Sequence, residues 1–431
     1  MLDFLQKACY NVRTMAITLT SDQENAKNLI AEWYFNTNDL VFVLAGYAGT
    51  GKTFLINHVV RDVLHLESGD EAAFVSPTGK AATVLAQGGT VAGTVHGLIY
   101  YRDGDDFTVD ENGEIIESDR LVFERRPSID ERIKLIVVDE ASMVNEEMLH
   151  DLLSFGVKCL FCGDQAQLPP VSGMCPLLAR PNYELREIVR QAADNPIIQI
   201  ATMAREGRDI PFGNFGDKVS VISRRQLQGE RRKRVFLKAD QIICGRNRTR
   251  NEINAEMRGY LGVPQDAFLP TENEKLICTL NNWEKPLDED ERFFLVNGLI
   301  GRVKNIQEHA DCLLTMEFQA DNLGQEISVV ADAGIFLFNE YAHGYGDQAV
   351  QLHGNNFVHE SNRKLLRKAK AVGQETICRF EFAYAITCHK AQGSEFNTVV
   401  VYDESWVFGE ERHRWLYTAI TRAKDKLLIV R

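Results

Sequence analysis

The sequence predicts an α/β fold of two parallel-sheet domains, each interrupted by a smaller β insertion. Within residues 1–180, apolar runs typical of buried strands alternate with polar loops and helical segments. Apolar strands return at 241–244, 398–402 and 426–430. In two other stretches, β-prone residues and tight-turn signals replace the helical period. The predicted units are a first domain at 1–180 with an insertion at about 97–127, and a second domain at 181–285 and 377–431 with an insertion at 286–376.

The composition is that of a globular protein long enough for two or three compact units. The 431 residues are 45% hydrophobic and 25% charged, with a net charge of −13. This acidic balance argues against a uniformly basic surface, but a local basic groove remains compatible with it because binding depends on the field at the site. Nine irregularly spaced cysteines indicate a reducing compartment, and the absence of a leader or a membrane-length apolar run predicts a cytoplasmic protein. Cys159 and Cys162 have the spacing of half a zinc site, but they lie in a predicted buried strand without a second ligand pair, so metal binding is not expected there.

A glycine-rich segment, Ala45–Thr53, joins the apolar run 40–44 to an apolar helical run from Phe54. Its glycines let backbone N–H groups face a polyphosphate, and the helix N-terminus adds its positive dipole end. Lys52 can reach the β- and γ-phosphates while the Thr53 hydroxyl takes a position on Mg²⁺. The alternative is a glycine turn that only connects a strand to a helix; the apolar flanks favour nucleotide binding.

Two adjacent carboxylates, Asp139 and Glu140, end the apolar run 133–138. Because neighbouring residues on a strand face opposite sides, the two acids can have different roles. We expect Asp139 to hold Mg²⁺ and Glu140 to orient and deprotonate the attacking water. An acidic pair at a helix N-terminus is the plainer alternative. Gln167 follows the next predicted strand, 157–162, from where it could sense a γ-phosphate.

Several other segments carry weaker signals. Residues 1–38 are expected to be helical, with Gln23 in a first turn where its amide either grips a base edge or caps the helix. The apolar run 72–75 ends in Ser76–Ala82, at the strand end where open α/β sheets bind ligands. Asn112-Gly113 predicts a hairpin, with a solvated loop as the alternative.

Two basic runs are also open to interpretation. The segment 362–370 is predicted to be a basic helix that either contacts a nucleic-acid backbone or forms solvated surface. The run Arg231–Arg234 is expected to be a solvated face.

The motifs taken in order resemble those of superfamily 1 helicases, and the resemblance spans nearly the whole chain. The segments His389–Phe396 and Asp139–Ser142 look most like the RecD-like branch that includes phage Dda. The matching segments are 19–23, 45–53, 76–82, 94–96, 139–142, 163–171, 185–191, 387–396 and 417–422.

The resemblance implies two RecA-like P-loop domains with ATP and Mg²⁺ between them and single-stranded DNA across both. It also implies a strand-separating β-hairpin pin at 97–127 and an SH3-like barrel at 286–376. The implied catalytic residues are Lys52, Asp139, Glu140, Gln167 and the arginine fingers Arg190 and Arg422. The implied nucleotide-binding residues are Gln23, Gly46, Ala48, Gly49, Thr50, Gly51, Lys52, Thr53, Gly393 and Glu395, with Thr53 and Asp139 on Mg²⁺. The implied DNA-binding residues are Pro77, Thr78, Gly79, Lys80, Thr94, His96, Thr387, His389 and Lys390.

The function implied by the resemblance is that of an ATP-dependent DNA helicase moving 5′→3′. We expect it to act as a monomer on single-stranded DNA and on junctions with duplex, alongside replication or recombination proteins, in the cytoplasm of a bacterial or phage-infected cell. One alternative is a translocase that displaces proteins or remodels forks. The other is a non-catalytic DNA-binding subunit, against which the presence of Lys52, Glu140, Arg190 and Arg422 argues.

Overall fold

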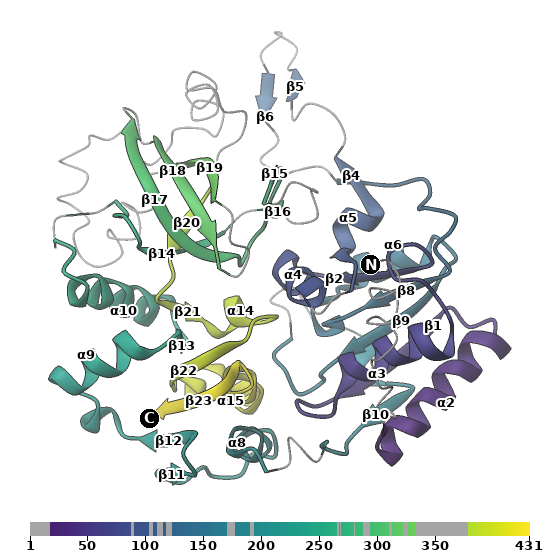
Figure 1. Cartoon of the computed structure of the whole chain (residues 1–431), viewed down its shortest axis with the longest axis horizontal. Helices are drawn as coiled ribbons and strands as arrows, with labels where there is room; N and C mark the ends of the chain where they lie inside the picture. The colour runs from purple at the N-terminus through teal and green to yellow at the C-terminus, as the bar shows by residue number, and fades with distance from the viewer. Residues whose placement is uncertain are drawn as a thin grey trace, which may run out of the picture.

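The computed structural model has two α/β domains side by side and a separate antiparallel sheet above the second (Figure 1). Among the residues that it describes, every helix is too short or too polar to cross a bilayer. The predicted helical residues 1–17 lie outside this part of the chain. The described residues are 18–87, 90–102, 107–109, 115–117, 123–169, 177–189, 194–264, 267, 269–279, 281–287, 294–309, 313–321, 326–332 and 378–431.

The first sheet is parallel throughout, in the order β10-β1-β9-β8-β2-β3. Its strands are β1 (Val41–Gly46), β2 (Ala72–Ser76), β3 (Ala92–Thr94), β8 (Leu135–Val138), β9 (Lys158–Gly163) and β10 (Tyr183–Leu185). Its helical segments are α2 (Ser21–Asn36), α3 (Lys52–His58), the π-helical turn η1 (Val59–Val63), α4 (Gly79–Gln87), α5 (Val95–Ile99), the 3₁₀ turn η2 (Ala141–Met143), α6 (Glu146–Leu153) and the 3₁₀ turn η3 (Leu177–Ala179).

Both faces of this sheet are buried. Along β1, Phe42 and Leu44 pack into a core with α2 and α3, whereas Val43 and Ala45 pack into a second core with α5 and α6. A parallel sheet covered on both faces requires continuously apolar strands. This requirement explains why apolar runs identified the strands, and the predicted parallel α/β fold is confirmed.

The first sheet includes a strand beyond residue 180, the predicted end of the first domain. Strand β10 pairs with β1 from Leu44–Tyr183 to Gly46–Leu185 and forms an edge of the first sheet. The predicted bounds place this segment in the second domain. A three-residue edge strand shows too little periodicity to be recognised from its residues alone.

The second sheet has the order β11-β12-β23-β22-β13-β21 and is parallel except for the pair β11–β12. Helices α8 and α15 pack on one face, and α9 and α10 pack on the other. The strands are β11 (Gly213–Phe215), β12 (Val219–Ile222), β13 (Gln241–Cys244), β21 (Ala385–Thr387), β22 (Phe396–Tyr402) and β23 (Ala423–Val430). The helical segments are α8 (Pro196–Arg205), η4 (Arg224–Gln226), α9 (Gly229–Lys238), α10 (Asn247–Tyr260), α14 (Cys388–Ala391), the 3₁₀ segment η6 (Ser405–Glu411) and α15 (Arg412–Ile420).

Two antiparallel ribbons interrupt the first domain. Strand β4 (Tyr100–Arg102) pairs with β7 (Phe123–Arg125), and β5 (Phe107–Val109) pairs with β6 (Ile115–Glu117). Figure 1 shows β5 and β6 projecting from the rest of the domain. The predicted turn at Asn112-Gly113 lies outside the described residues.

The insertion of the second domain contains an antiparallel sheet with its own apolar core and the order β19-β18-β17-β14-β20. Strands β14 and β20 lie outside the predicted range 286–376, and the basic segment 362–370 lies outside the described residues. The strands of this unit are β14 (Lys275–Cys278), β15 (Asn282–Pro286), β16 (Phe294–Leu295), β17 (Ile300–His309), β18 (Leu313–Ala320), β19 (Glu326–Asp332) and β20 (Phe380–Phe382).

The turn after β16 brings this insertion against the first domain. A Cβ on Gly79, at the start of α4, would lie 2.4 Å from the Val296 side chain. A Cβ on Gly298 would lie 3.7 Å from Cδ of Lys80. The insertion therefore contacts both domains rather than standing apart from them.

Candidate nucleotide and nucleic-acid sites

The glycine-rich segment forms a tight loop between β1 and α3. Gly49 and Gly51 have φ angles of 82° and 74°, which residues with a Cβ rarely adopt. A Cβ on Gly46 would lie 2.9 Å from Oγ1 of Thr50. The N-terminus of α3 has no side-chain cap, which leaves its N–H groups free of a competing side chain. These are the features of an anion-binding helix end.

Lys52 and Thr53 open the helix behind this loop. The Lys52 ammonium donates to the carbonyl oxygens of Gly46 (2.6 Å) and Tyr47 (3.2 Å), and Thr53 is exposed. The loop therefore carries a fixed cation on one side and a solvent-accessible hydroxyl on the other.

Asp139 and Glu140 follow β8, which is separated from β1 by β9 in the same sheet. The charge of Lys52 nevertheless acts on both carboxyl groups and opposes the rise in their pKa values that burial causes. An oxygen of Asp139 accepts a hydrogen bond from the Glu140 N–H (2.9 Å), and Glu140 has a φ angle of 53°. Such a left-handed conformation is unusual for a glutamate and is found more often at functional sites. Burial raises the pKa of Glu140 to about 7 against the opposing charge of Arg422, and burial also raises the pKa of Asp139. A carboxyl group that titrates near neutrality is suited to exchange protons with water.

Gln167 and Gln23, both predicted to contact the nucleotide, differ in whether the protein already satisfies their amide groups. Gln167 is buried, and its Oε1 has no hydrogen-bond partner among the described residues. Gln23 is engaged by the protein, because its Nε2 donates to the Thr50 carbonyl (3.0 Å) and its Oε1 accepts from the Thr20 N–H (3.0 Å). The contact of Gln23 with a base therefore stays a prediction.

Four residues of the second domain are predicted to contact the nucleotide, and they differ in how well the structure supports that prediction. They are Arg190, Gly393, Glu395 and Arg422. Arg422 is buried, donates to the carbonyls of Thr418 (3.1 Å) and Ser394 (3.2 Å), and lowers the pKa of Glu140 across the cleft. Arg190 lies outside the described residues. Gly393 packs against Ala81 and Thr78, and Glu395 pairs with Lys424 at 3.2 Å, so their contact with a nucleotide stays a prediction.

Side chains that sequence reasoning did not single out join the two domains here. The Tyr417 hydroxyl accepts from the Ala48 N–H (2.8 Å) and donates to Asp164 (2.5 Å). The guanidinium of Arg205 lies 3.6 Å from the centre of the Tyr47 ring. Tyr417 lies in the segment 417–422, one of those that match the helicase motifs. Its contact with Ala48 joins residues 369 positions apart, which no local pattern reveals.

The loop after β9 connects this site to a second one. The Leu168 N–H donates to the Thr418 hydroxyl (2.9 Å), and the Gln392 amide donates to the Leu168 carbonyl (2.7 Å). Leu168 follows Gln167 directly in the chain. Gln392 lies in the wall of a cavity between the domains.

This interdomain cavity has a volume of about 330 Å³ and collects most of the residues predicted to bind DNA. Thr387 is the exception, being a buried residue at the start of α14. Asn281, Asn297 and Gly298 of the insertion also line the cavity and were not predicted, because turn residues in an irregular β segment carry no distinctive signal. The lining residues are Pro77, Thr78, Gly79, Lys80, Thr94, His96, Met143, Asn281, Asn297, Gly298, His389, Lys390 and Gln392.

The polar groups of the interdomain cavity are partly desolvated. The Lys80 ammonium is buried without a hydrogen-bond partner among the described residues, and burial lowers its pKa to about 7. Burial also lowers the pKa of His96 and His389, which favours neutral imidazoles. Lys390 pairs with Glu381 at 2.6 Å. The cavity thus combines hydroxyls, neutral rings and a buried amine without a carboxylate partner.

The residues present fit a nucleoside triphosphate with Mg²⁺. The cramped space at Gly46 and the uncapped α3 suit a phosphate group, and the unpaired Oε1 of Gln167 suits a polar ligand atom. The Thr53 hydroxyl and the Asp139 carboxylate are the oxygen ligands that Mg²⁺ prefers.

Two family sequence profiles match the chain. One, described as an AAA domain, matches residues 18–222, and the other, described as a UvrD-like helicase C-terminal domain, matches residues 382–430. The ATP-dependent RecD2 DNA helicase of Deinococcus radiodurans is 28% identical over 405 residues, which cover 89% of this chain and 46% of that protein. The chain spans less than half the length of the first curated relatives that it matches.

Solved structures of Pif1 helicases have a similar fold. A structure of two coordinating Pif1 helicases on forked dsDNA aligns with a TM-score of 0.52 and 17% identity, covering 96% of this chain and 92% of that one. The Pif1 helicase from Bacteroides in complex with ADP-AlF3 and ssDNA aligns with a TM-score of 0.50, the same identity and the same coverage. At this identity the similarity establishes a shared fold.

Proposed function

We propose that this chain, which belongs to the superfamily 1 helicases of the RecD and Pif1 type, hydrolyses ATP to move along single-stranded DNA and unwind duplex DNA. The proposed direction is 5′→3′. The proposed substrates are single-stranded DNA and its junctions with duplex.

The observation that carries this proposal is the link between the two sites through the loop after β9. Gln392, in the wall of the interdomain cavity, holds the Leu168 carbonyl, and Leu168 follows Gln167 at the nucleotide site. The same loop is held by Thr418 and Tyr417 of α15. A shift of one domain relative to the other must therefore disturb both sites together, and such a coupling is what a motor requires.

At the nucleotide site, the loop at 46–51 and Lys52 would bind the phosphates of ATP. Thr53 and Asp139 would hold Mg²⁺, which when bound neutralises phosphate charge. Glu140 would accept the proton of the attacking water, and Gln167 would contact the γ-phosphate. Arg422 would complete the site from the second domain, together with Arg190.

In the interdomain cavity, Lys80 from α4 and His389 and Lys390 from α14 would contact the strand. Contacts from both domains allow each to hold DNA in turn as the cleft opens and closes. The mixture of hydroxyls, rings and few cations suits a DNA backbone bound without sequence preference.

The remaining assignments are part of the same proposal. The two ribbons at 97–127 would serve as the strand-separating pin, and the antiparallel insertion would be an SH3-like domain. The protein would act as a monomer in the cytoplasm, with replication or recombination proteins as partners. The first domain would end just past Leu185 rather than at 180.

The decisive experiment measures ATP turnover with and without oligothymidylate for the wild type, Glu140→Gln and Arg422→Ala. Both variants should lose DNA-stimulated turnover by about 10²- to 10³-fold, because each removes a group that acts in the transition state. Arg414→Ala, on the helix α15 that precedes Arg422 and paired with Glu411, is the matched control and should retain activity. Turnover unaffected by DNA in the wild type would show that the proposal is wrong.

Unwinding of duplexes with a single 5′ or 3′ tail tests direction. The proposal expects unwinding from the 5′ tail. A variant without residues 105–118 should translocate but unwind poorly. Unchanged unwinding by that variant would contradict the assignment of this segment to a pin.

A further inference from the structure

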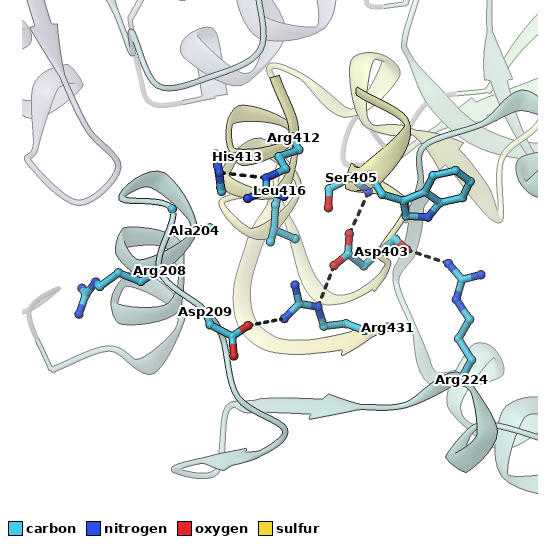
Figure 2. A pocket seen from close by; sticks show the side chains of 12 residues that line it. Ala204, Arg208, Asp209, Arg224, Asp403, Ser405, Arg412, His413, Leu416 and Arg431 are labelled. Atoms are coloured by element: carbon cyan, nitrogen blue, oxygen red, sulfur yellow. Dashed lines mark hydrogen bonds and ion pairs between the residues drawn. The ribbon is translucent and has the colours of Figure 1, made fainter. Parts of the chain in front are cut away.

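A second cavity, of about 490 Å³, lies on the second domain and belongs to neither site described above (Figure 2). It lies where β12, β22 and β23 end, between the C-terminal end of α8 and the N-terminal end of α15. The carboxyl ends of strands in open α/β sheets are where ligands bind. We call it the arginine pocket, and the lining residues used in the argument are Arg224, Trp406, Arg412 and Arg431.

The arginine pocket has more cationic groups than its own acids neutralise. Four arginines and two aspartates line it. Arg431 forms ion pairs with both aspartates, with Asp403 at 3.0 Å and with Asp209 at 3.7 Å, as the dashed lines in Figure 2 show. Two arginines, 224 and 412, have no carboxylate partner among the described residues.

The contacts of these two arginines leave charge directed to the pocket. Arg224 donates to the Asp403 carbonyl (2.8 Å) and lies over the Tyr402 ring. Arg412 donates to Nε2 of His413 (3.0 Å). Neither contact cancels a positive charge, and the pocket therefore suits an anionic ligand.

Trp406 adds an aromatic surface to this charge. Its side chain is 63% exposed, and the guanidinium of Arg246 lies 5.3 Å from its ring centre. An exposed tryptophan beside arginines is the combination on which nucleic-acid bases stack while phosphates pair with cations.

The segment η6 connects the arginine pocket to the interdomain cavity. Trp406 lies at its beginning, and two residues later the Phe408 ring lies 5.9 Å from the ring of His389, which lines the interdomain cavity. Phe408 also stacks on the buried Trp415 at 5.6 Å. The segment η6 therefore lines the arginine pocket through Ser405 and Trp406 and contacts, through Phe408, a residue that lines the interdomain cavity.

We propose that the arginine pocket binds the segment of single-stranded DNA adjacent to that in the interdomain cavity, with a base stacked on Trp406 and phosphates on Arg224 and Arg412. This inference rests on the proposed function. An acidic protein segment would also match the arginines. The contact of η6 with His389 of the interdomain cavity and the exposed Trp406 side chain favour nucleic acid.

The test measures affinity for oligothymidylates of about 6 to about 30 nucleotides, a range that starts near the site size of a single binding module. Trp406→Ala should weaken binding of the long oligonucleotides about tenfold and leave the shortest unchanged, because only a long strand reaches both cavities. Arg412→Gln should reduce the salt dependence of long-strand binding by about 0.7 in the log–log slope. Phe212→Ala is the matched control, since Phe212 is also 63% exposed and belongs to the same domain.

Tryptophan fluorescence gives a second readout that does not depend on a loss of affinity. Long oligonucleotides should quench the wild type, and Trp406→Phe should retain most of the affinity but lose that part of the quenching.

Wild-type affinity of Trp406→Ala at every length would overturn the inference and leave the proposed function intact. Equal weakening at all lengths would also overturn it. Binding of a synthetic acidic peptide that depends on Trp406, with unchanged DNA affinity, would instead assign the pocket to a protein partner. Failure of the wild type to bind any oligonucleotide would refute the proposed function itself.

Discussion

The two sheets each place a helix N-terminus after a strand, and neither helix has a side-chain cap, but only the second has a buried carboxylate beside it. In the first, β1 leads through glycines to α3, whose N-terminus has no side-chain cap. In the second, β13 leads through Gly245 and Arg246 to α10, and the buried carboxylate of Glu404 lies against that end. Its oxygens accept from the N–H groups of Gly245 and Arg246, both at 3.0 Å, and from the Thr249 hydroxyl at 2.7 Å.

The difference shows how one architecture supplies two roles. A buried carboxylate that binds the N–H groups just before a helix disfavours a phosphate at that helix end, because the two negative charges repel each other. The open helix end of the first domain retains the capacity to bind phosphate. The second domain is therefore expected to supply Arg422 rather than a second nucleotide site.

The largest effect is expected from substitution of Lys52, behind the loop that precedes α3. Lys52→Ala should reduce ATP turnover about 10³-fold with an almost unchanged melting temperature, because the side chain is partly exposed and serves a ligand rather than the core. Steady-state turnover and thermal unfolding measure the two effects. An equal loss of stability and turnover would mean that the lysine is mainly structural.

The opposite result is expected at Glu404. Glu404→Ala should lower the free energy of unfolding by about 3 to 5 kcal/mol, because it leaves Arg246 and two N–H groups without their partner. Turnover per folded molecule should change little. Denaturant unfolding of this variant, with Glu404→Gln as the milder substitution, distinguishes a structural carboxylate from one that participates in turnover.

The pH dependence of stability sharpens this prediction. Burial tends to raise the pKa of Glu404, but its hydrogen bonds outweigh burial and hold the pKa below the usual value. A lowered folded-state pKa means that the stabilisation is present above the ordinary glutamate pKa of about 4.3 and is lost as the pH falls below it. The wild type should lose stability over that interval more steeply than Glu404→Gln.

Lys52 and Lys80, both in the first domain, differ in the hydrogen-bond partners of their ammonium groups. The Lys52 ammonium has two carbonyl acceptors, whereas Lys80 has none among the described residues, and burial lowers its pKa to about 7. Nearby Lys275 and Arg422 lower this pKa further, and Asp321 opposes them. Phosphate binds the charged form, so DNA affinity should be constant below about pH 7 and fall by up to about tenfold per pH unit above it.

Lys80→Arg should remove this pH dependence, because the guanidinium stays protonated. Fluorescence anisotropy with a labelled oligonucleotide from about pH 6 to about pH 9 measures it. A pH profile that is the same for both proteins would contradict the assignment.

The smallest effect is expected at Tyr417, which joins the domains. Tyr417→Phe removes the partner of the Ala48 N–H and of Asp164, at a cost of about 1 to 3 kcal/mol. DNA-stimulated turnover should fall several-fold while DNA-independent turnover changes less. The ratio of these two rates is the measurement, and an unchanged ratio would show that Tyr417 does not couple the sites.

Features set by local chemistry were predicted from the sequence. Glycines with positive φ, apolar strands and the acids that follow β8 depend on neighbours in the chain, and these were found where expected. Contacts set by folding were not predicted. Glu404 lies 155 residues from Thr249, its hydrogen-bond partner, and the edge strand β10 is too short to show a period. Burial also determines the lowered pKa of Lys80, and no residue pattern reports burial between domains.

The turn at 296–298 has a consequence for how a polymer enters and leaves. Val296 lies on Gly79 and Gly298 on Lys80, so the insertion bridges the two domains beside the interdomain cavity. A strand bound in this cavity, as proposed above, would lie beside the turn, and it could leave sideways only if the turn moved away from α4. Loading onto a covalently closed single-stranded circle should accordingly be limited by that opening, whereas a free end can be fed in directly.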